Sequence, residues 1–591
     1  MSNKSVLLGI SATIAAAFTL QVAAQDEDQY EATVFEEVIV TAAKREQTLQ
    51  KIPIAVTVVT ADMMEKAQIN DIKDLQSLVP SLRVTQLQLT GNTNFVIRGF
   101  GNGANNSGIE PSVGVFIDGV YRSRSASALA DLPNLERIEV LRGPQSTLFG
   151  KNASAGIISV ITAKPDTEEF GGSAAITYGD FNQFILKGDV SGPVSDTVAF
   201  SLSGSMNKRD GYFTDLTNGS EYNEHDRWGI RGQLLFQPTD KLELRIIADT
   251  EEIDEACCGV ANLVNGPTGA IIQLIGGQIL PEAPFARAQY FDFAPVNEIE
   301  NSGISLQADY DFDSATLTSI TAFRNQSKFE NADVDFTSAR LINPNSSDTD
   351  IDTFTQEIRI TSSGESAFDW MIGGFYFDEQ VKVDNILTYG QDFRNYADVL
   401  TVVLAGGTPG LDPSPLGFLE PALGLPAGTF FASGQGRFEA YAQDNQAFSI
   451  FGQFDFHMMD DRVTLTLGAN YTVDKKDMSA NMLVTDVFSS LDFVQIGTGF
   501  IFNALTGLPP TPEYFALVPT AFFAAVALST VPCTPQTGPA CNSLLALQPL
   551  QFMPPFLNFP NSVETGHSKD DDVTWTARLA FDATDHVNVY V

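Results

Sequence analysis

Residues 463–471 read Val463-Thr464-Leu465-Thr466-Leu467-Gly468-Ala469-Asn470-Tyr471, in which apolar side chains alternate with polar or small ones. Successive side chains of a β-strand point to opposite faces, so this stretch predicts a strand with one apolar and one polar face. Residues 241–249 repeat the pattern, with Leu242, Leu244, Ile246 and Ala248 opposite Lys241, Glu243, Arg245 and Asp249. Such segments run for about ten residues, whereas strands of globular sandwiches run for about five or six. They therefore favour the wall of a water-lined transmembrane barrel over a sandwich.

The connections between these segments alternate between short and long. Short polar turns are expected at residues 192–196, 237–240, 311–314, 458–461 and 582–585, as is typical of the periplasmic end of a barrel. Long connections, at roughly 250–300, 380–444 and 473–570, lie at the other end, and loops of this length are usually functional. The pattern predicts about twelve strands and the start of another. An open edge in lipid would leave backbone amides unpaired, so we expect the C-terminal strands of the barrel to be missing.

Composition is consistent with this class of fold. The formal net charge is −39, which argues against binding to nucleic acid, whose phosphates would be repelled. Hydrophobic residues make up 43% of the chain and Phe occurs 43 times, which suits a barrel with acidic loops and aromatic girdles. A large secreted β-protein also has this composition, so composition alone does not separate the two.

The N-terminus predicts export. Residues 1–24 read as a signal peptide, with Lys4 in the positive region, an apolar run over 6–20 and a small-residue cleavage site at Val22-Ala23-Ala24. The alternative is a membrane anchor. The apolar run is short for a span and is interrupted by polar residues, which favours cleavage.

Residues 47–165 predict a compact α+β domain. Strands are expected at 54–59 and 94–97, and a helix capped by Thr60 or Asp62 is expected to end before Pro80. The dipeptide Asp118-Gly119 predicts a hairpin between 113–117 and 120–121. Residues 99–104 match the spacing of a dinucleotide-binding loop, but turn formers follow instead of a helix, so we interpret 100–108 as a flexible loop.

Four stretches carry a resemblance to a known family: 136–150 (ERIEVLRGPQSTLFG), 155–162 (AGIISVIT), 97–99 (IRG) and 115–121 (VFIDGVY). Together they resemble the plug of TonB-dependent outer-membrane receptors. Residues 36–42 (EEVIVTA) resemble the TonB box of this family. The run is β-branched and has no partner strand nearby, which suits strand addition by another protein.

The resemblance implies a transmembrane antiparallel β-barrel of about 22 strands with the N-terminal α+β plug domain inside it. Residues 25–46 would be a periplasmic segment with the TonB box, 47–165 the plug, and 166–591 an incomplete barrel. The protein would be a monomer in the cell outer membrane, in contact with outer-membrane lipid. TonB, with its inner-membrane energising complex, would drive active import of a scarce ligand.

The resemblance also implies residue roles. TonB coupling falls to Glu37, Val38, Ile39, Val40, Thr41 and Ala42, and holding or gating of the plug falls to Arg98, Arg137, Glu139 and Arg142. The ligand contacts implied at the plug apex are Gly101, Asn102, Asn105, Asn106, Tyr121, Arg122 and Arg124. Exposed charge pairs contribute about 0–1 kcal/mol. Against a barrel wall the charges of 137–142 would form a polar interface, and the alternative is a solvated strand face.

The ligand is not specified by any motif. A ferric siderophore complex is the first expectation from the family, and a glycan, cobalamin or an apolar compound is the alternative. Residues 490–560 are rich in Phe and Leu, which is consistent either with contact to an apolar ligand or with packing of these side chains on each other. Asp348, Asp350 and Asp352 suit Ca²⁺ or a solvated strand end.

Other functional classes fit less well. A passive porin would have neither plug nor TonB box, and a surface adhesin would need no coupling segment. The four His are scattered and no nucleophile elbow or zinc motif is present, so the sequence predicts no enzyme, no metal site and no cofactor. Cys533 and Cys541 flank a loop that a disulfide can close in an oxidising compartment. Cys257 and Cys258 can pair with each other, pair with the other two or stay free.

Overall fold

The computed structural model describes residues 39–41, 44–45, 47–50, 52–87, 89–102, 106–129, 134–363, 366–533, 541–551, 561–584 and 587–591. The expected signal peptide, Glu37, Val38, Ala42 and Asn105 lie outside the described residues.

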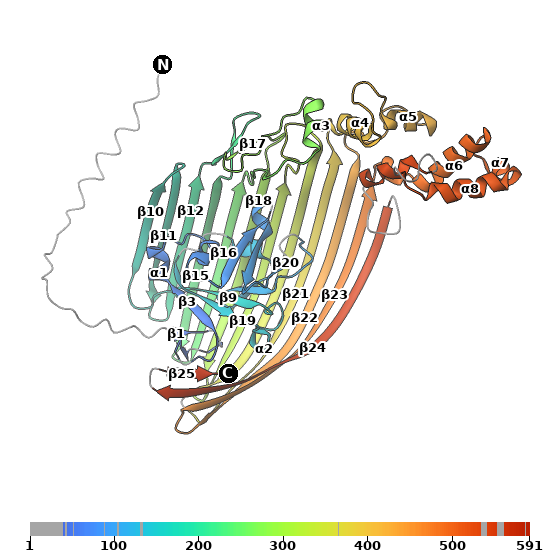
Figure 1. Cartoon of the computed structure of the whole chain (residues 1–591). Coiled ribbons are helices and arrows are strands. Elements are labelled where there is room, and N and C mark those ends of the chain that lie inside the picture. The colour runs from blue at the N-terminus through green and yellow to red at the C-terminus, as the bar shows by residue number, and fades with distance from the viewer. Residues whose placement is uncertain are drawn as a thin grey trace, which may run out of the picture. The chain divides into compact units, whose positions relative to one another are not determined.

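The described residues form one large antiparallel sheet of 13 strands, which we call the wall (Figure 1). Its strands neighbour each other in chain order, as in an up-and-down barrel. They are β10 (Gly171–Gly179), β11 (Gln183–Ser195), β12 (Val198–Arg209), β15 (His225–Thr239), β16 (Leu242–Glu255), β18 (Val296–Asp311), β19 (Ala315–Asn331), β20 (Ile342–Ser362), β21 (Phe368–Tyr389), β22 (Gly436–Met458), β23 (Val463–Val484), β24 (Asn561–Thr584) and β25 (Val587–Tyr590). The prediction of about twelve strands and the start of another is confirmed.

The alternation read from the sequence is present in the wall. In β23, Leu467, Ala469 and Tyr471 are exposed on the outer face, whereas Thr466 and Asn470 are buried on the inner face. The expected strand length of about ten residues is wrong for the later strands, since β24 has 24 residues. The strands extend beyond the stretch in which apolar and polar side chains alternate. Backbone hydrogen bonds between strands form in water as well as in lipid, so the strand ends need no apolar face. The long connections are correspondingly shorter than expected and cover 256–295, 390–435 and 485–560.

The plug is the predicted α+β domain. Its main sheet has the order β3-β8-β9-β6-β7, with β6 and β9 parallel, and β4 and β5 form a separate pair. The elements are β3 (Val56–Thr60), α1 (Ala61–Lys66), β4 (Leu82–Gln86), β5 (Thr93–Ile97), β6 (Val113–Ile117), β7 (Val120–Arg122), β8 (Leu135–Arg142), α2 (Ser146–Phe149) and β9 (Gly156–Thr162). A short strand β1 (Ile39–Val40) precedes them. In Figure 1 the plug, drawn from blue to cyan, lies against one face of the wall.

The expected long helix after β3 is wrong. Thr60 caps α1 as predicted, with its Oγ1 accepting from the backbone N–H of Met63, but α1 ends at Lys66. Gln68 has a left-handed backbone, with φ of 54°, and the carboxylate of Asp74 accepts from the backbone N–H groups of Asn70 and Asp71. These local bonds compete with helix continuation, and only a 3₁₀ turn, η1 (Asp74–Ser77), follows.

Helices occupy the long connections, at the end of the wall opposite the short turns (Figure 1). They are α3 (Gly269–Leu274), α4 (Phe393–Leu404), α5 (Pro415–Ala422), α6 (Phe493–Thr506), α7 (Pro512–Leu517) and α8 (Pro519–Ser529). Tyr389, Phe431, Phe488 and Phe493 pack in one buried cluster, so the Phe-rich connections do pack on each other. In the described part of the chain, no helix has the length and apolar character needed to cross a membrane.

Candidate functional site

The end of the expected TonB box is bound to the plug through Glu139. The backbone N–H of Thr41 donates to Glu139 Oε1 at 2.8 Å, and Thr41 Oγ1 donates to the same oxygen at 3.2 Å. Arg137 Nε also donates to it, at 2.8 Å. Glu139 lies in the middle of β8 and is fully buried. Three residues singled out from the sequence therefore meet at one carboxylate oxygen.

Two further residues tie the same segment to the wall. Lys44 Nζ lies 2.6 Å from Glu357 Oε2 in β20, and Arg45 Nη1 lies 2.9 Å from Asp455 Oδ2 in β22. The ammonium group of Lys44 also lies over the rings of Phe149 in α2 and Phe451 in the wall. Burial lowers the pKa of Lys44, and Glu357 partly offsets this. Sequence reasoning missed both pairs because the partners lie more than 300 residues away.

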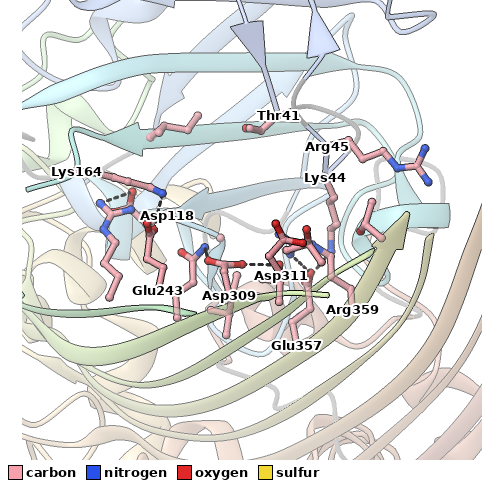
Figure 2. Close-up of a pocket in the computed structure, with 18 of the residues that line it drawn as sticks. Thr41, Lys44, Arg45, Asp118, Lys164, Glu243, Asp309, Asp311, Glu357 and Arg359 are labelled. Atoms are coloured by element: carbon pink, nitrogen blue, oxygen red, sulfur yellow. Dashed lines mark hydrogen bonds and ion pairs between the residues drawn. The ribbon is translucent and has the colours of Figure 1, made fainter. Parts of the chain in front are cut away.

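A cavity of about 1000 Å³ opens beside these pairs, between the plug and the inner face of the wall (Figure 2). Besides Lys44, Arg45 and Glu357, its charged lining includes Asp118, Lys164, Glu243, Asp309, Asp311 and Arg359. It reaches the short turns of the wall at Thr197 and Asp240. This space is large and polar enough for water, and Thr41, Lys44 and Arg45 lie in its lining.

The hairpin between β6 and β7 is held to the wall by its turn residue. Asp118 has φ of 50° and Gly119 has φ of 77°, as the predicted two-residue turn requires. The carboxylate of Asp118 lies 2.7 Å from Arg231 Nη1 and 3.5 Å from Arg245 Nη2. Next to it, the carboxylate of Asp249 in β16 forms ion pairs with three guanidinium groups. They belong to Arg122 in the plug and to Arg231 and Arg324 in the wall. The plug therefore contacts the wall through charged groups as well as through apolar contacts, such as that of Val120 with Ile320 and Ala322.

A second charged cluster lies on the β23 side. Glu110 of the plug lies 2.7 Å from Lys151 Nζ and 2.6 Å from Lys476 Nζ, and Lys151 also lies 2.8 Å from Asp474. Burial raises the pKa of Glu110, but the two ammonium groups outweigh it and hold the pKa at about 2. Glu110 is therefore ionised at neutral pH and binds plug to wall.

The residues predicted to contact ligand fall into two groups. Asn102 and Asn106 are exposed and Gly101 is half-buried, on the loop before β6. Tyr121, Arg122 and Arg124 are buried against the wall instead. Arg124 Nη2 lies 3.0 Å from Glu379 Oε1, and the Tyr121 hydroxyl accepts from Asn152 Nδ2 at 2.8 Å. These three side chains already have partners in the structure, whereas the exposed asparagines are accessible to a ligand.

The remaining predicted residues are placed as follows. Arg98 is exposed with φ of 53°. Arg142 donates to the backbone carbonyls of Ala55 and Val56, inside the plug. Disulfides join Cys533 to Cys541 and Cys257 to Cys258. Asp348, Asp350 and Asp352 are exposed along one face of β20, and within the described ranges no group of three or more His, Cys, Asp or Glu is placed to hold a metal ion.

Comparison with known proteins agrees with this architecture. Residues 48–157 match the family model "TonB-dependent Receptor Plug Domain". The chain is 28% identical over 203 residues to the ferrioxamine B receptor of Salmonella typhimurium, covering 33% of this chain and 27% of that protein. It is 27% identical over 205 residues to the vitamin B12 transporter BtuB of Vibrio vulnificus, covering 34% of this chain and 31% of that protein.

Solved structures show the same fold. The ferric yersiniabactin uptake receptor FyuA from Yersinia pestis superimposes with a TM-score of 0.62 at 16% identity, over 91% of this chain and 63% of that one. The siderophore receptor PiuA from Acinetobacter baumannii gives a TM-score of 0.59 at 14% identity, over 92% and 64%. The chain spans less than two thirds of either structure and about a third of the curated relatives that it matches.

An antiparallel wall with a plug on its inner face, a plug-family match and receptor relatives define one class of protein. Residues 48–157 match the plug domain of the TonB-dependent receptor family, and the wall that follows has the fold of outer-membrane receptors. Known members of this family are transport receptors rather than enzymes.

Proposed function

We propose that this receptor imports a scarce nutrient across the outer membrane with energy supplied by TonB and its inner-membrane complex. One observation carries the proposal: Thr41, at the end of the expected TonB box, is bound to Glu139 of plug strand β8, and Lys44 and Arg45, which follow the box, are bound to the wall. A pull on residues 37–42 would therefore act first on contacts that hold the plug in place.

The chemistry of these contacts suits repeated opening and closing. TonB would add a strand to residues 37–42 and pull. Separating a buried ion pair costs about 3–5 kcal/mol, which is small for a process driven from the inner membrane. Charged groups released from the interface are then hydrated by water from the adjoining cavity. An apolar seam would have no such compensation, because exposing it to water is unfavourable.

The plug element that receives this pull is α2. Lys44 lies over Phe149 at its C-terminal end, and Asn470 of the wall donates to the backbone carbonyls of Ser146 and Thr147 in α2. Withdrawal of Lys44 would loosen α2 from β22 and β23 and widen the cavity into a passage.

The first candidate for the cargo is a ferric siderophore complex, since the names of several relatives specify one. Cobalamin is the second candidate, because one relative is named a vitamin B12 transporter. A glycan or an apolar compound is a further alternative. The exposed Asn102 and Asn106 are the plug residues we assign to ligand contact.

Deletion of residues 37–42 in the full-length protein tests energy coupling. We expect ligand binding to the cell surface to remain and accumulation inside the cell to be lost. Undiminished accumulation would contradict TonB-driven import, and loss of surface binding as well would point to misfolding, which recovery of the protein in the outer membrane checks.

The abundance of the receptor in iron-starved and iron-replete cells tests the cargo. A strong rise on chelation supports a ferric complex. An unchanged level would remove iron as the first candidate and direct the search to growth on other nutrients.

A further inference from the structure

A second cavity lies at the opposite end of the plug from the coupling segment. It has a volume of about 500 Å³ and is bounded on the plug side by Leu89, Asn92 and residues 106–108. The wall side is formed by inner-face residues of β19 to β23. Its volume lies within the range of about 300–1,000 Å³ that is typical of ligand pockets. We call it the apex cavity.

The charged residues that line the apex cavity are paired with each other. Lys328 Nζ lies 2.5 Å from Glu330 Oε2, and Arg437 Nε lies 2.7 Å from Glu439 Oε1. Asn385 Nδ2 also donates to Glu439, at 3.1 Å. Two cations and two anions give a formal charge of zero, and each of the four described charged side chains has its counter-ion within the lining.

The uncharged lining offers hydrogen bonds and apolar surface together. Asn106 and Gln443 supply amides and Tyr441 supplies a hydroxyl, whereas Val383, Leu387 and Met478 are apolar. Such a mixture matches a ligand with several amide or hydroxyl groups on a partly apolar frame.

The connection after β23, the longest of the wall, supplies no cation that could attract an anion. Residues 485–560 contain Asp486, Asp492 and Glu513 as their only charged residues, and no Lys or Arg. Asp486 accepts from the hydroxyl of Tyr389, and Asp492 caps α6. With a net charge of −39, the chain would repel an anionic ligand on approach, and an anion that reached the cavity would lose water without gaining a free cation.

We propose that the apex cavity selects an uncharged, bulky ligand that is rich in amide or hydroxyl groups and has an apolar part. The proposal rests on the import function above and names its substrate class. A neutral ferric trihydroxamate and a neutral oligosaccharide share this chemistry, whereas a ferric tricatecholate, which is strongly anionic, does not. Cationic ligands are disfavoured for the same reason as anions, because the cavity carboxylates are already paired.

Binding to the purified full-length receptor, followed by calorimetry, tests the proposal with three probes: a ferric trihydroxamate, a neutral maltodextrin and a ferric tricatecholate. We expect at least one neutral probe to bind, about tenfold or more tighter than the tricatecholate. Its affinity should change little between about 0.05 and 0.5 M salt, because no net charge is neutralised. Equal or tighter binding of the tricatecholate, or no binding by either neutral probe, would overturn the proposal.

A charge variant gives a second, independent readout. Glu439→Gln leaves Arg437 without its counter-ion and should improve binding of the ferric tricatecholate by about tenfold. Asp350→Asn makes the same charge change on an exposed face of β20 and should leave that affinity unchanged. An equal gain in both variants would show that only overall charge matters and would overturn the assignment to this cavity. Binding to purified protein needs no TonB, so its outcome is separate from that of the uptake test.

Discussion

At the scale of single residues, the arrangement depends on carboxylates that are buried with their partners. Glu139 is fully buried and accepts three hydrogen bonds, from Thr41 and Arg137. Hydrogen bonds to an ionised group contribute about 1.5–3 kcal/mol each. Glu139 therefore sets how firmly Thr41 is held against plug strand β8.

Replacing Glu139 with Gln removes the charge but keeps the shape. We expect the segment around Thr41 to detach more readily, by about 1.5–3 kcal/mol, and residues 39–45 to be cleaved faster by protease added to the periplasmic side. Glu136→Gln is the matched control, because Glu136 also pairs with Arg137 but its side chain is half-exposed. Equal cleavage of both variants would contradict the role given to Glu139.

Glu110 predicts a dependence of plug attachment on pH. Its pKa in the folded protein is about 2, below its ordinary value of 4.5. A depressed pKa contributes stability that is complete above pH 4.5 and is lost as pH falls towards 2, and a shift of this size corresponds to about 3 kcal/mol. We expect Glu110→Gln to unfold the plug at lower denaturant concentration at pH 7 and to be closer to the unchanged protein at pH 3. A constant difference between the two proteins across this range would contradict the assignment.

Sequence reasoning reached only part of this chemistry. Thr41, Arg137 and Glu139 stood out because of a β-branched run and an alternating charged strand. The pairs Lys44–Glu357 and Arg45–Asp455 did not stand out, because nothing in the local sequence marks a Lys or Arg whose partner is brought near only when the N-terminal segment packs against the wall. The partners of Glu110 were missed for the same reason.

At the scale of elements, the helices of the long connections form a lobe with its own core. Phe430 and Phe431 from the connection after β21 pack on Phe488 from the connection after β23. The Cys533–Cys541 disulfide closes a short loop after α8. Connections of this length would be costly to order without such a core and cross-link.

Cys533→Ser should loosen this lobe. Closing a loop of this size contributes about 2–3 kcal/mol in the chain-entropy model. We expect proteases applied to whole cells to cleave within 485–560 faster in the variant, while the wall stays intact. Cys541→Ser should behave identically, and reduction of the unchanged protein should reproduce the effect. Equal cleavage rates in all these proteins would show that the disulfide does not support the lobe.

Alternation of side chains predicted the faces of the strands correctly, since burial and exposure alternate in β23 from Thr466 to Tyr471. Strand ends could not be predicted in this way, because pairing beyond the membrane band needs no apolar face. The helix after β3 was overestimated because apolar spacing alone does not report the competing side-chain bonds of Asp74. The helices of the long connections were not predicted, because the alternation of apolar and polar residues that marks strands says nothing about helices.

At the scale of the whole molecule, charged groups join the plug to the wall from Asp118 on one side to Glu110 on the other, and apolar contacts such as Val120 on Ile320 lie between them. The family resemblance predicted a plug and a wall of antiparallel strands. The two cavities depend on how the plug sits against the wall, which no linear pattern encodes. Their positions at opposite ends of the plug are those expected of an entrance for ligand and an exit beside the coupling segment.

Import as proposed requires α2 to separate from the wall. A Cβ atom at Gly468 would lie 2.9 Å from Thr147 Cγ2 in α2, so Thr147→Cys with Gly468→Cys places two sulfurs within bonding reach. Thr576 Cγ2 would lie equally close to the new Cβ atom at position 468. Thr576→Ser is therefore added to the double-cysteine protein and to its single-cysteine control, to make room for that atom.

Uptake by cells carrying the double-cysteine receptor, before and after a reducing agent, is the most direct measurement. The account predicts normal surface binding, loss of uptake while the cross-link is intact, and recovery on reduction, with the single-cysteine control unaffected throughout. Full uptake with the cross-link intact would contradict it, because the ligand would then have passed without movement of α2.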